Sequence, residues 1–504
     1  MDFFRKHKFE IIILSALALT YFVSRFFSIL SLPIFTDEAI YVRWAQIAKQ
    51  DANWRFISLT DGKQPMLIWL MMVSLRIIAD PLLAGRIVSV GAGFLTLIGI
   101  YFLGREVFKS NKIGLISCAL YVIFPMALVY DRMALYDSLV GTFAVWALLL
   151  IVLLVRKVRM DIALILGMVI GGGALTKTNA FFSIYLLPFS LLLFDWSKKT
   201  ARSRLLRWVG LCLISVMLTY GIYSVLRLSP FFHIIDEKNA IFVYPFKEWL
   251  NHPFEFFIGN MRAFLDWISR YLTWPLLSIA FLSFFLSKTF TREKITLLLW
   301  FILPIIALGF FGRTLYPRFI FFMILPLLSL IAYSLENIYL RFNKTYLFVI
   351  FCFLFFFLAF KTDYLILTDF TKANIPGSDI NQYLASWPAG GGIKESVEFF
   401  EREAKKGKIY IATEGTFGLM PYAYEIYLVN NPNIKIEGYW PIGDVLPAKV
   451  TEESKKIPTY FVFYQSCDSC IGTEAPRTWP LTQVLKIKKG EDGSYLTVYK
   501  VNKI

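Results

Sequence analysis

Long apolar segments alternate with short polar stretches over roughly the first 360 residues of the chain. In order, the apolar segments are 11–30, 65–79, 83–104, 113–130, 138–155, 161–175, 179–194, 208–228, 271–287, 295–311, 317–334 and 345–360. A helix of about 20 apolar residues crosses the hydrocarbon core of a bilayer. The pattern therefore predicts a polytopic α-helical membrane protein.

The short connections carry clusters of lysine and arginine that predict its orientation. These clusters are Arg5–Lys8, Arg105–Lys112, Arg156–Arg159, Lys198–Arg207, Lys288–Lys294 and Arg341–Lys344. Basic short loops stay in the cytoplasm, and all of these do so only if segment 65–79 does not cross. That segment is short and begins at Pro65, so we interpret it as an interfacial or re-entrant helix. We expect about eleven transmembrane helices plus interfacial helices in the plasma membrane, with a cytoplasmic N-terminus.

Composition supports a membrane protein and argues against nucleic-acid binding. Hydrophobic residues make up 57% of the 504 residues, and the mean hydropathy is +0.58. Both values exceed those of a soluble domain. The net charge is +16, but much of it lies in loops between spans, and no ordered basic and aromatic surface is visible. Cys467 and Cys470 form a C-x-x-C, for which we favour a disulfide over zinc if this region is extracellular.

The chain divides into a transmembrane domain, residues 1–360, and a polar domain, residues 361–504. An odd number of spans places the second domain outside the cytoplasm. Its periodicity predicts a helix over Ile393–Lys406 that stops at Gly407. The predicted strands are Lys408–Thr413, Tyr424–Val429, Tyr460–Tyr464, Leu485–Lys489 and Tyr495–Val501. We therefore expect a C-terminal extracytoplasmic α/β domain.

An acidic pair, Asp37-Glu38, follows the first apolar segment and opens the outer loop 31–82. Lipid disfavours carboxylates, so the pair does not serve to anchor the segment. Ala39 to Lys49 then reads as a short amphipathic helix that would hold the pair at the membrane surface. A helix N-terminus with acids in its first turn is the alternative interpretation.

Basic residues also gather at the outer ends of spans, the side that the positive-inside rule disfavours. They are Arg25, Lys63, Arg86, Arg132, Lys177, Arg227, Arg313 and Arg318. Snorkelling to the interface explains any one of them, Arg25 and Arg227 most readily. An anion held at the outer interface explains the whole set, because arginine and lysine pair strongly with phosphate.

The acidic set is equally one-sided and completes a chemical hypothesis. Asp37, Glu38, Asp131 and Asp137 all fall at outer ends. A carboxylate can take a proton from an acceptor hydroxyl, while basic groups neutralise a departing phosphate. This is the chemistry of moving a sugar from a lipid phosphate to a hydroxyl. The three histidines show no ligand spacing and receive no role.

An ordered set of motifs over about residues 1–360 resembles the membrane glycosyltransferases of the C-type fold. Within that fold the likeness is to the protein O-mannosyltransferase and aminoarabinose (lipid A) transferase group. Lys63-Gln64-Pro65-Met66 is similar to its Lys-Pro-Pro-Leu, with Gln in place of the first Pro. The other matching motifs are Asp37-Glu38-Ala39-x-Tyr41, Arg86, Arg132-Met133-Ala134-Leu135-Tyr136-Asp137-Ser138, Leu175-Thr176-Lys177 and Tyr316-Pro317-Arg318-Phe319 followed by Leu325-Pro326.

The resemblance implies an inverting glycosyltransferase with an outward-facing site, a polyprenyl-phosphate-linked sugar as donor and a hydroxyl on a protein, lipid or glycan as acceptor. Asp37 would be the catalytic base, with Glu38 and Asp137 as positioning or metal-binding carboxylates. The donor phosphate would be bound by Lys63, Arg86, Arg132, Lys177, Arg313 and Arg318.

Two alternatives accompany this assignment. Oxygen ligands suit Mg²⁺ or Mn²⁺, for which Asp37 and Asp137 are the candidate ligands, although no pattern requires a metal. A polytopic transporter or flippase of lipid-linked sugars is the second function. Transporters typically carry repeats and polar groups near the bilayer midplane, whereas the charges here lie at one edge and no repeat is visible.

Overall fold

The computed structural model describes residues 8–342, 344–467, 478–490 and 494–503, apart from the side chains of 466 and 467. The chain forms two compact units. Unit 1 comprises Met1–Phe27, Phe56–Leu67 and Val88–Pro376, and unit 2 comprises Ser28–Arg55, Ile68–Ile87 and Gly377–Ile504. The predicted boundary at residue 360 stays a prediction.

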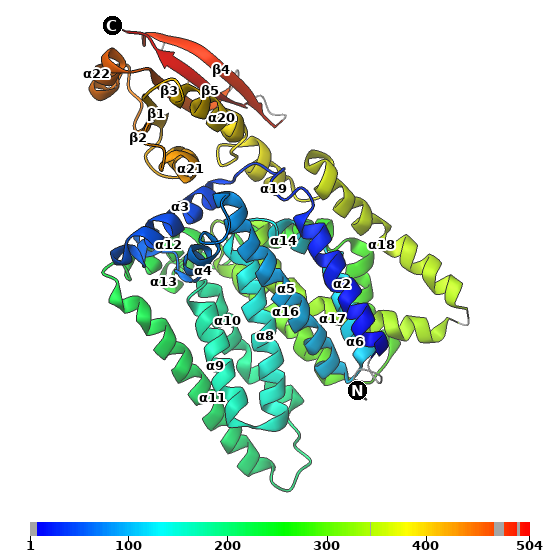
Figure 1. Ribbon diagram of the computed structural model, residues 1–504. Coiled ribbons are helices and arrows are strands. Elements are labelled where there is room, and N and C mark those ends of the chain that lie inside the picture. The colour runs from blue at the N-terminus through cyan, green and yellow to red at the C-terminus, as the bar shows by residue number, and fades with distance from the viewer. Residues whose placement is uncertain (1–7, 343, 468–477, 491–493, 504) are drawn as a thin grey trace. The chain divides into compact units, whose positions relative to one another are not determined.

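Unit 1 is entirely helical in its described residues (Figure 1). Its α-helices are α2 (Lys8–Phe26), α5 (Pro81–Phe108, from Val88 onward), α6 (Asn111–Val122), α7 (Pro125–Tyr130), α8 (Tyr136–Lys157), α9 (Met160–Ala174), α10 (Phe182–Leu186), α11 (Ala201–Tyr223), α12 (Ile234–Phe242), α13 (Phe246–Trp249), α14 (Phe257–Tyr271), α15 (Trp274–Leu286), α16 (Thr291–Phe311), α17 (Phe321–Arg341) and α18 (Thr345–Thr368). Short 3₁₀ helices are η2 (Ile57–Asp61), η3 (Thr178–Phe181), η4 (Leu187–Leu193), η5 (Ser224–Leu228), η6 (Pro317–Ile320) and η7 (Phe370–Lys372).

Several of these helices are long and apolar enough to cross a membrane, which confirms a multi-pass membrane protein. Among the described residues there are 7, or 8 if α14 and α15, bent by 100°, form one broken span. The remaining predicted segments form shorter helices. Segment 113–130, for example, divides into α6 and α7 at Pro125, which lacks the N–H that an unbroken helix needs. The count of about eleven spans stays a prediction.

The helices pack around α17, the most deeply buried of the span-length helices. It contacts α6, α8, α15 and α16, and its apolar face carries Leu325, Leu328 and Ile331 into the core. Helices α8, α9 and α11 lie side by side in chain order (Figure 1). This packing brings the starts of α8 and η3 together, where the candidate site lies.

Unit 2 contains the helix of the first outer loop and a mixed sheet. Its helices are α3 (Thr36–Gln50), η1 (Ala52–Trp54), α4 (Met66–Ser74, from Ile68 onward), α19 (Gly377–Ile380), a π-helical turn at Asn381–Ala385, α20 (Ile393–Ala404), α21 (Leu419–Leu428) and α22 (Ala448–Lys456). Its strands are β1 (Ile409–Glu414), β2 (Ile434–Tyr439), β3 (Thr459–Cys467), β4 (Leu481–Lys489) and β5 (Ser494–Val501). Helix α4 has 9 residues and a length of about 14 Å at 1.5 Å per residue, too short to cross a bilayer.

The sheet has the order β2-β1-β3-β5-β4. Strand β1 is parallel to β2 and β3, with Ile411 opposite Ile436 and Tyr460, and β5 is antiparallel to β3 and β4. Phe461 and Phe463 are fully buried in its aromatic core. The predicted C-terminal α/β domain is therefore confirmed as a fold, and its placement outside the cytoplasm stays a prediction.

One strand prediction in this domain was wrong. Tyr424–Val429 belongs to helix α21 and its C-cap, and the second strand of the sheet is Ile434–Tyr439 instead. A short apolar run does not by itself distinguish a strand from a buried helix. Tyr424 and Leu428 lie one helical turn apart and are both buried, and α21 packs against α3. The Cys467–Cys470 disulfide prediction falls outside the described residues.

Candidate active site

The first outer loop positions the acidic pair at the start of helix α3 in unit 2. Ile34 and Thr36 form backbone hydrogen bonds with Gly390 and Pro388. A Cβ at Gly390 would lie 2.4 Å from the Ile34 carbonyl oxygen, so only glycine allows this approach. Asp37 and Glu38 then occupy the first turn of α3, where the helix dipole favours acidic side chains.

The two acids differ in their surroundings. Glu38 is fully buried and its carboxylate accepts the backbone N–H of Phe35 at 3.0 Å. Asp37 is partly exposed. Of this acidic pair, only Asp37 is accessible to a substrate.

Arg86 forms a buried ion pair with Glu38 and holds the loop around it. Its Nε and Nη2 donate to the two oxygens of Glu38 at 2.9 and 2.8 Å. Its remaining N–H groups donate to the carbonyl oxygens of Ile29, Leu32 and Pro33 at 2.6, 3.0 and 3.1 Å. A guanidinium has five N–H donors, so Arg86 has none left for a phosphate. This geometry favours a positioning role over the predicted phosphate contact.

A second acid–base pair lies in unit 1. Asp137 is in the first turn of α8 and is buried. Lys177 lies between α9 and η3 and is partly exposed, and its Nζ is 2.9 Å from Asp137 Oδ1. The ammonium also lies 4.4 Å from the ring centre of Phe319, which attracts a cation through its π face. The structure thus joins two motifs that are 40 residues apart in the sequence.

Two phenylalanine rings connect Lys177 with the other predicted basic residues. Lys63 lies 5.2 Å from the ring of Phe242, and Phe242 packs edge-on against Phe319 at 5.7 Å. The guanidinium of Arg318 lies 5.9 Å from the Phe319 ring. Arg313 donates its backbone N–H to the Phe242 carbonyl at 2.8 Å, while its guanidinium lies 5.3 Å from the ring of Tyr244. We call Lys63, Lys177, Arg313 and Arg318 the cation cluster.

Gln64, which departs from the family motif, ties this cluster together. Its Nε2 donates to Thr178 Oγ1 at 2.9 Å, beside Lys177. Its backbone carbonyl accepts the hydroxyl of Tyr136 at 2.8 Å, beside Asp137. The side-chain amide and the backbone carbonyl of Gln64 together fix segment 62–67 against the chain neighbours of Lys177 and Asp137. A proline at this position could not make the side-chain bond.

Gly62 sets the conformation of the same segment. Its φ is +64°, in the left-handed region that side chains rarely adopt. A Cβ there would meet the Lys238 Cβ at 2.5 Å and the Ile234 carbonyl oxygen at 2.6 Å. The glycine is required for both the turn and the close packing of α12.

Arg132, Arg25 and Asp131 are further charged residues of unit 1. Arg132 is buried and donates to the carbonyl of Phe27 at 2.8 Å. The snorkelling interpretation of Arg25 was wrong, because Arg25 is fully buried and its Nε lies 3.6 Å from Asp131. Burial raises the pKa of Asp131 to about 6, and Tyr121 donates a hydrogen bond to it at 3.0 Å. Arg227 is exposed and lies next to the ring of Phe232. For this residue, snorkelling to the interface stays the prediction.

The described residues contain no group of three or more His, Cys, Asp and Glu arranged to hold a metal ion. Of the two predicted ligands, Asp137 already binds the ammonium of Lys177 through Oδ1. The metal stays a prediction.

Sequence reasoning missed the aromatic part of the site. Phe242 is the last residue of α12 and belongs to no recognisable motif, and Phe319 received no role of its own within the motif Tyr316-Pro317-Arg318-Phe319. Alternation of basic and aromatic residues in Tyr316-Pro317-Arg318-Phe319 was the available signal. For Phe242 the sequence contained no such signal, because only tertiary packing brings this residue to Phe319.

Comparison with solved structures identifies the fold. The chain is similar to ArnT from Cupriavidus metallidurans in the apo state, with 15% identity, a TM-score of 0.60 and coverage of 98% of both chains. The same protein bound to undecaprenyl phosphate gives 14% identity, a TM-score of 0.57 and the same coverage. The archaeal oligosaccharyltransferase AglB from Archaeoglobus fulgidus, in complex with an inhibitory peptide and a dolichol-phosphate, gives 14% identity and a TM-score of 0.52 over 91% of this chain and 69% of AglB.

These similarities define a polytopic membrane protein with the C-type glycosyltransferase fold, as the motifs predicted. Residues 62–223 also match the sequence profile of the dolichyl-phosphate-mannose-protein mannosyltransferase family. That region contains Arg86, Asp137 and Lys177. No curated protein sequence matches the chain significantly.

Proposed function

We propose that the chain is an inverting glycosyltransferase that moves a sugar from a polyprenyl-phosphate donor to a hydroxyl acceptor at the membrane surface. The observation that carries this proposal is the Asp137–Lys177 pair within the cation cluster. Several cations around two aromatic rings suit a phosphate that gains charge as the sugar leaves. ArnT bound to undecaprenyl phosphate and AglB in complex with a dolichol-phosphate share the fold and support the same donor class.

Each residue receives a role from its surroundings. Lys63, Lys177, Arg313 and Arg318 would contact the donor phosphate, with Asp137 orienting Lys177. The partly exposed Asp37 would be the base. Glu38 and Arg86 would position the first outer loop. Arg132 stays a candidate phosphate contact.

The transfer needs one base and no acid. The acceptor hydroxyl oxygen forms a bond to the anomeric carbon, and its proton passes to Asp37. The bond from that carbon to the phosphate oxygen breaks, and its electron pair leaves with the phosphate. Attack from the face opposite the leaving phosphate inverts the anomeric carbon. The cation cluster supplies positive charge for the departing anion.

The test is transfer by Asp37→Asn in purified protein. A panel of polyprenyl-phosphate sugars would be supplied, and the acceptor read by mass spectrometry. We expect the rate to fall at least roughly a hundredfold, the scale of general-base catalysis, with donor binding retained. Asp51→Asn, at the other end of α3, is the matched control. Near-normal turnover by Asp37→Asn would reduce the acidic pair to a helix start and overturn the mechanism.

We further propose that the site and residues 361–504 face away from the cytoplasm. The basic connections between spans support this orientation. A reporter fused after Lys361 should behave as exported, and cytoplasmic reporter activity there would reverse the whole topology. The transporter alternative is not favoured, because the family profile and the fold are those of glycosyltransferases.

A further inference from the structure

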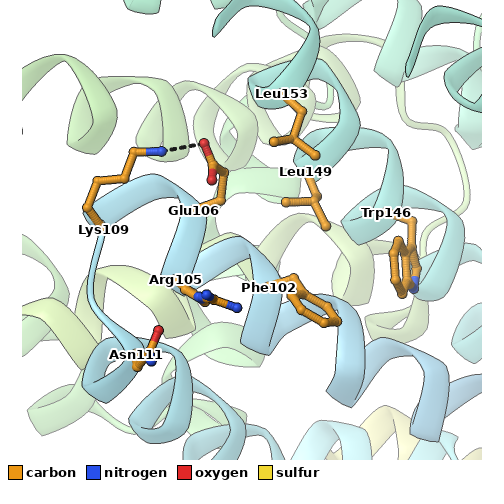
Figure 2. A pocket seen from close by; sticks show the side chains of 8 residues that line it. All are labelled: Phe102, Arg105, Glu106, Lys109, Asn111, Trp146, Leu149 and Leu153. Carbon is orange, nitrogen blue, oxygen red and sulfur yellow. Dashed lines mark hydrogen bonds and ion pairs between the residues drawn. The ribbon is translucent and has the colours of Figure 1, made fainter. Parts of the chain in front are cut away.

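A pocket with no assigned role opens where α5 ends and faces the last turns of α8 (Figure 2). Its volume is about 650 Å³. Leu153 on its wall lies 16 residues after Asp137 on the same helix, which is about 24 Å at 1.5 Å per residue. The pocket therefore lies toward the opposite end of α8 from the candidate active site.

One part of the pocket is an apolar wall. Trp146, Leu149 and Leu153 repeat at helical spacing on one face of α8, and Phe102 of α5 stands opposite them (Figure 2). The rings of Phe102 and Trp146 are 6.4 Å apart. The indole N–H of Trp146 donates to the carbonyl of Leu95 at 3.0 Å, which fixes the ring. Phe102 and Trp146 are not fully buried, so the wall is accessible to an apolar chain.

The other part is polar and carries net positive charge. Arg105, Glu106, Lys109 and Asn111 line it. Glu106 is already neutralised, with Lys109 at 2.5 Å and Arg156 at 3.1 Å. Arg105 is exposed, and among the described residues its guanidinium has no hydrogen-bond or ion-pair partner. An anionic group could therefore bind Arg105 without breaking an existing pair, and the Lys109 ammonium, which has three donors, could bind it while keeping its bond to Glu106.

We propose that this pocket binds an anionic phospholipid, with the phosphate on Arg105 and Lys109 and an acyl chain along Phe102, Trp146 and Leu153. Basic pockets between transmembrane helices on the cytoplasmic side are typical sites for acidic headgroups. The predicted topology places Arg105–Lys112 on that side, facing the leaflet whose lipids supply the charge. The proposal rests on that orientation and is independent of the transfer reaction.

Quenching of Trp146 fluorescence by brominated lipid tests the proposal. The full-length protein in detergent micelles would be titrated with phosphatidylglycerol or phosphatidylcholine brominated in the acyl chain. Subtracting the signal of Trp146→Phe isolates the contribution of this one indole. We expect that contribution to be quenched at severalfold lower mole fractions of phosphatidylglycerol than of phosphatidylcholine.

Variants of the basic rim separate the headgroup contact from general lipid exposure. Arg105→Gln should raise the half-quenching mole fraction of phosphatidylglycerol about fivefold, the effect of one basic residue at a membrane surface. Arg105→Lys should retain most of the preference. Lys157→Gln, an exposed charge at the end of α8 outside the pocket, is the matched control and should behave as wild type.

Three outcomes would overturn the proposal. Equal quenching by both lipids would show that Trp146 only faces bulk lipid. An unchanged preference in Arg105→Gln would remove the headgroup contact. Displacement of phosphatidylglycerol by inorganic phosphate at millimolar concentration would identify a site for the free ion instead of a lipid.

Discussion

The Glu38–Arg86 pair of unit 2 and the Asp137–Lys177 pair of unit 1 join the same kinds of charge in different surroundings. Both acids lie in the first turn of a helix and both are buried. Arg86 is fully buried and grips Glu38 with two N–H groups, whereas Lys177 is partly exposed and contacts Asp137 through one oxygen. The two cations differ in how they bind a carboxylate. A guanidinium is rigid and planar and can donate to both oxygens, whereas an ammonium is a compact point charge.

The comparison teaches that charge type alone does not assign a role in such a site. The donors of Arg86 are all used within residues 29–38, so its proposed role is to position this segment. Lys177 faces an aromatic ring beside other cations, so its pair suits a ligand. The sequence had predicted both Arg86 and Lys177 as contacts of the donor phosphate.

The largest effect is expected from removing the cation of the buried pair. Arg86→Met keeps the length of the side chain but leaves the buried Glu38 carboxylate without its counter-ion, which costs about 3–5 kcal/mol of stability. Hydrogen exchange over residues 29–40 should rise accordingly in the full chain. The double variant Glu38→Gln with Arg86→Met should lose less than Arg86→Met alone. If Arg86→Met exchanged like wild type, the positioning role would be wrong.

Glu414, at the end of β1, is a third buried acid. Its contribution to stability should depend on pH, which allows a comparison with the two ion-paired acids. Burial raises its pKa from 4.5 to about 7, although the backbone N–H of Tyr464 and the charge of Lys489 oppose this shift. An acid with a raised pKa contributes stability that is present below pH 4.5 and is lost as the pH rises through 7. Glu414→Gln stays neutral, so we expect it to match wild type near pH 4.5.

At pH 8 the same variant should be more stable than wild type by up to about 3 kcal/mol, since each pKa unit corresponds to 1.36 kcal/mol. Thermal unfolding of both proteins at the two pH values measures the difference. A stability difference that did not change with pH would mean that Glu414 ionises normally in the folded protein.

The clearest effect on binding is expected at the partly exposed Lys177, whose loss also leaves the buried Asp137 carboxylate without its ammonium. Lys177→Ala should weaken binding of undecaprenyl phosphate about tenfold to a hundredfold, because a hydrogen bond to a charged group contributes about 1.5–3 kcal/mol. Arg318→Ala should act in the same direction. Lys247→Ala, an exposed lysine of α13 outside the cation cluster, is the control. Unchanged affinity in both variants would return Lys177 and Arg318 to simple interfacial charges.

Local patterns in the sequence determined the class of protein and the ordered motifs. Apolar segments of membrane-spanning length predicted the helices, because each helix satisfies its backbone within itself and needs no distant partner. The helix after Asp37-Glu38 and four of the five predicted C-terminal strands followed from short-range periodicity for the same reason. These features depend on residues close in the sequence.

The partner of each charged side chain was decided only by the tertiary structure. Arg86 reaches Glu38 across 48 residues, and Lys177 reaches Asp137 across 40. The aromatic bridge through Phe242 and Phe319, and the choice of helix over strand at Tyr424, likewise depend on packing against distant elements. A linear pattern indicates charge and polarity, but burial and the number of unused donors, which distinguish Arg86 from Lys177, arise only when the chain has folded.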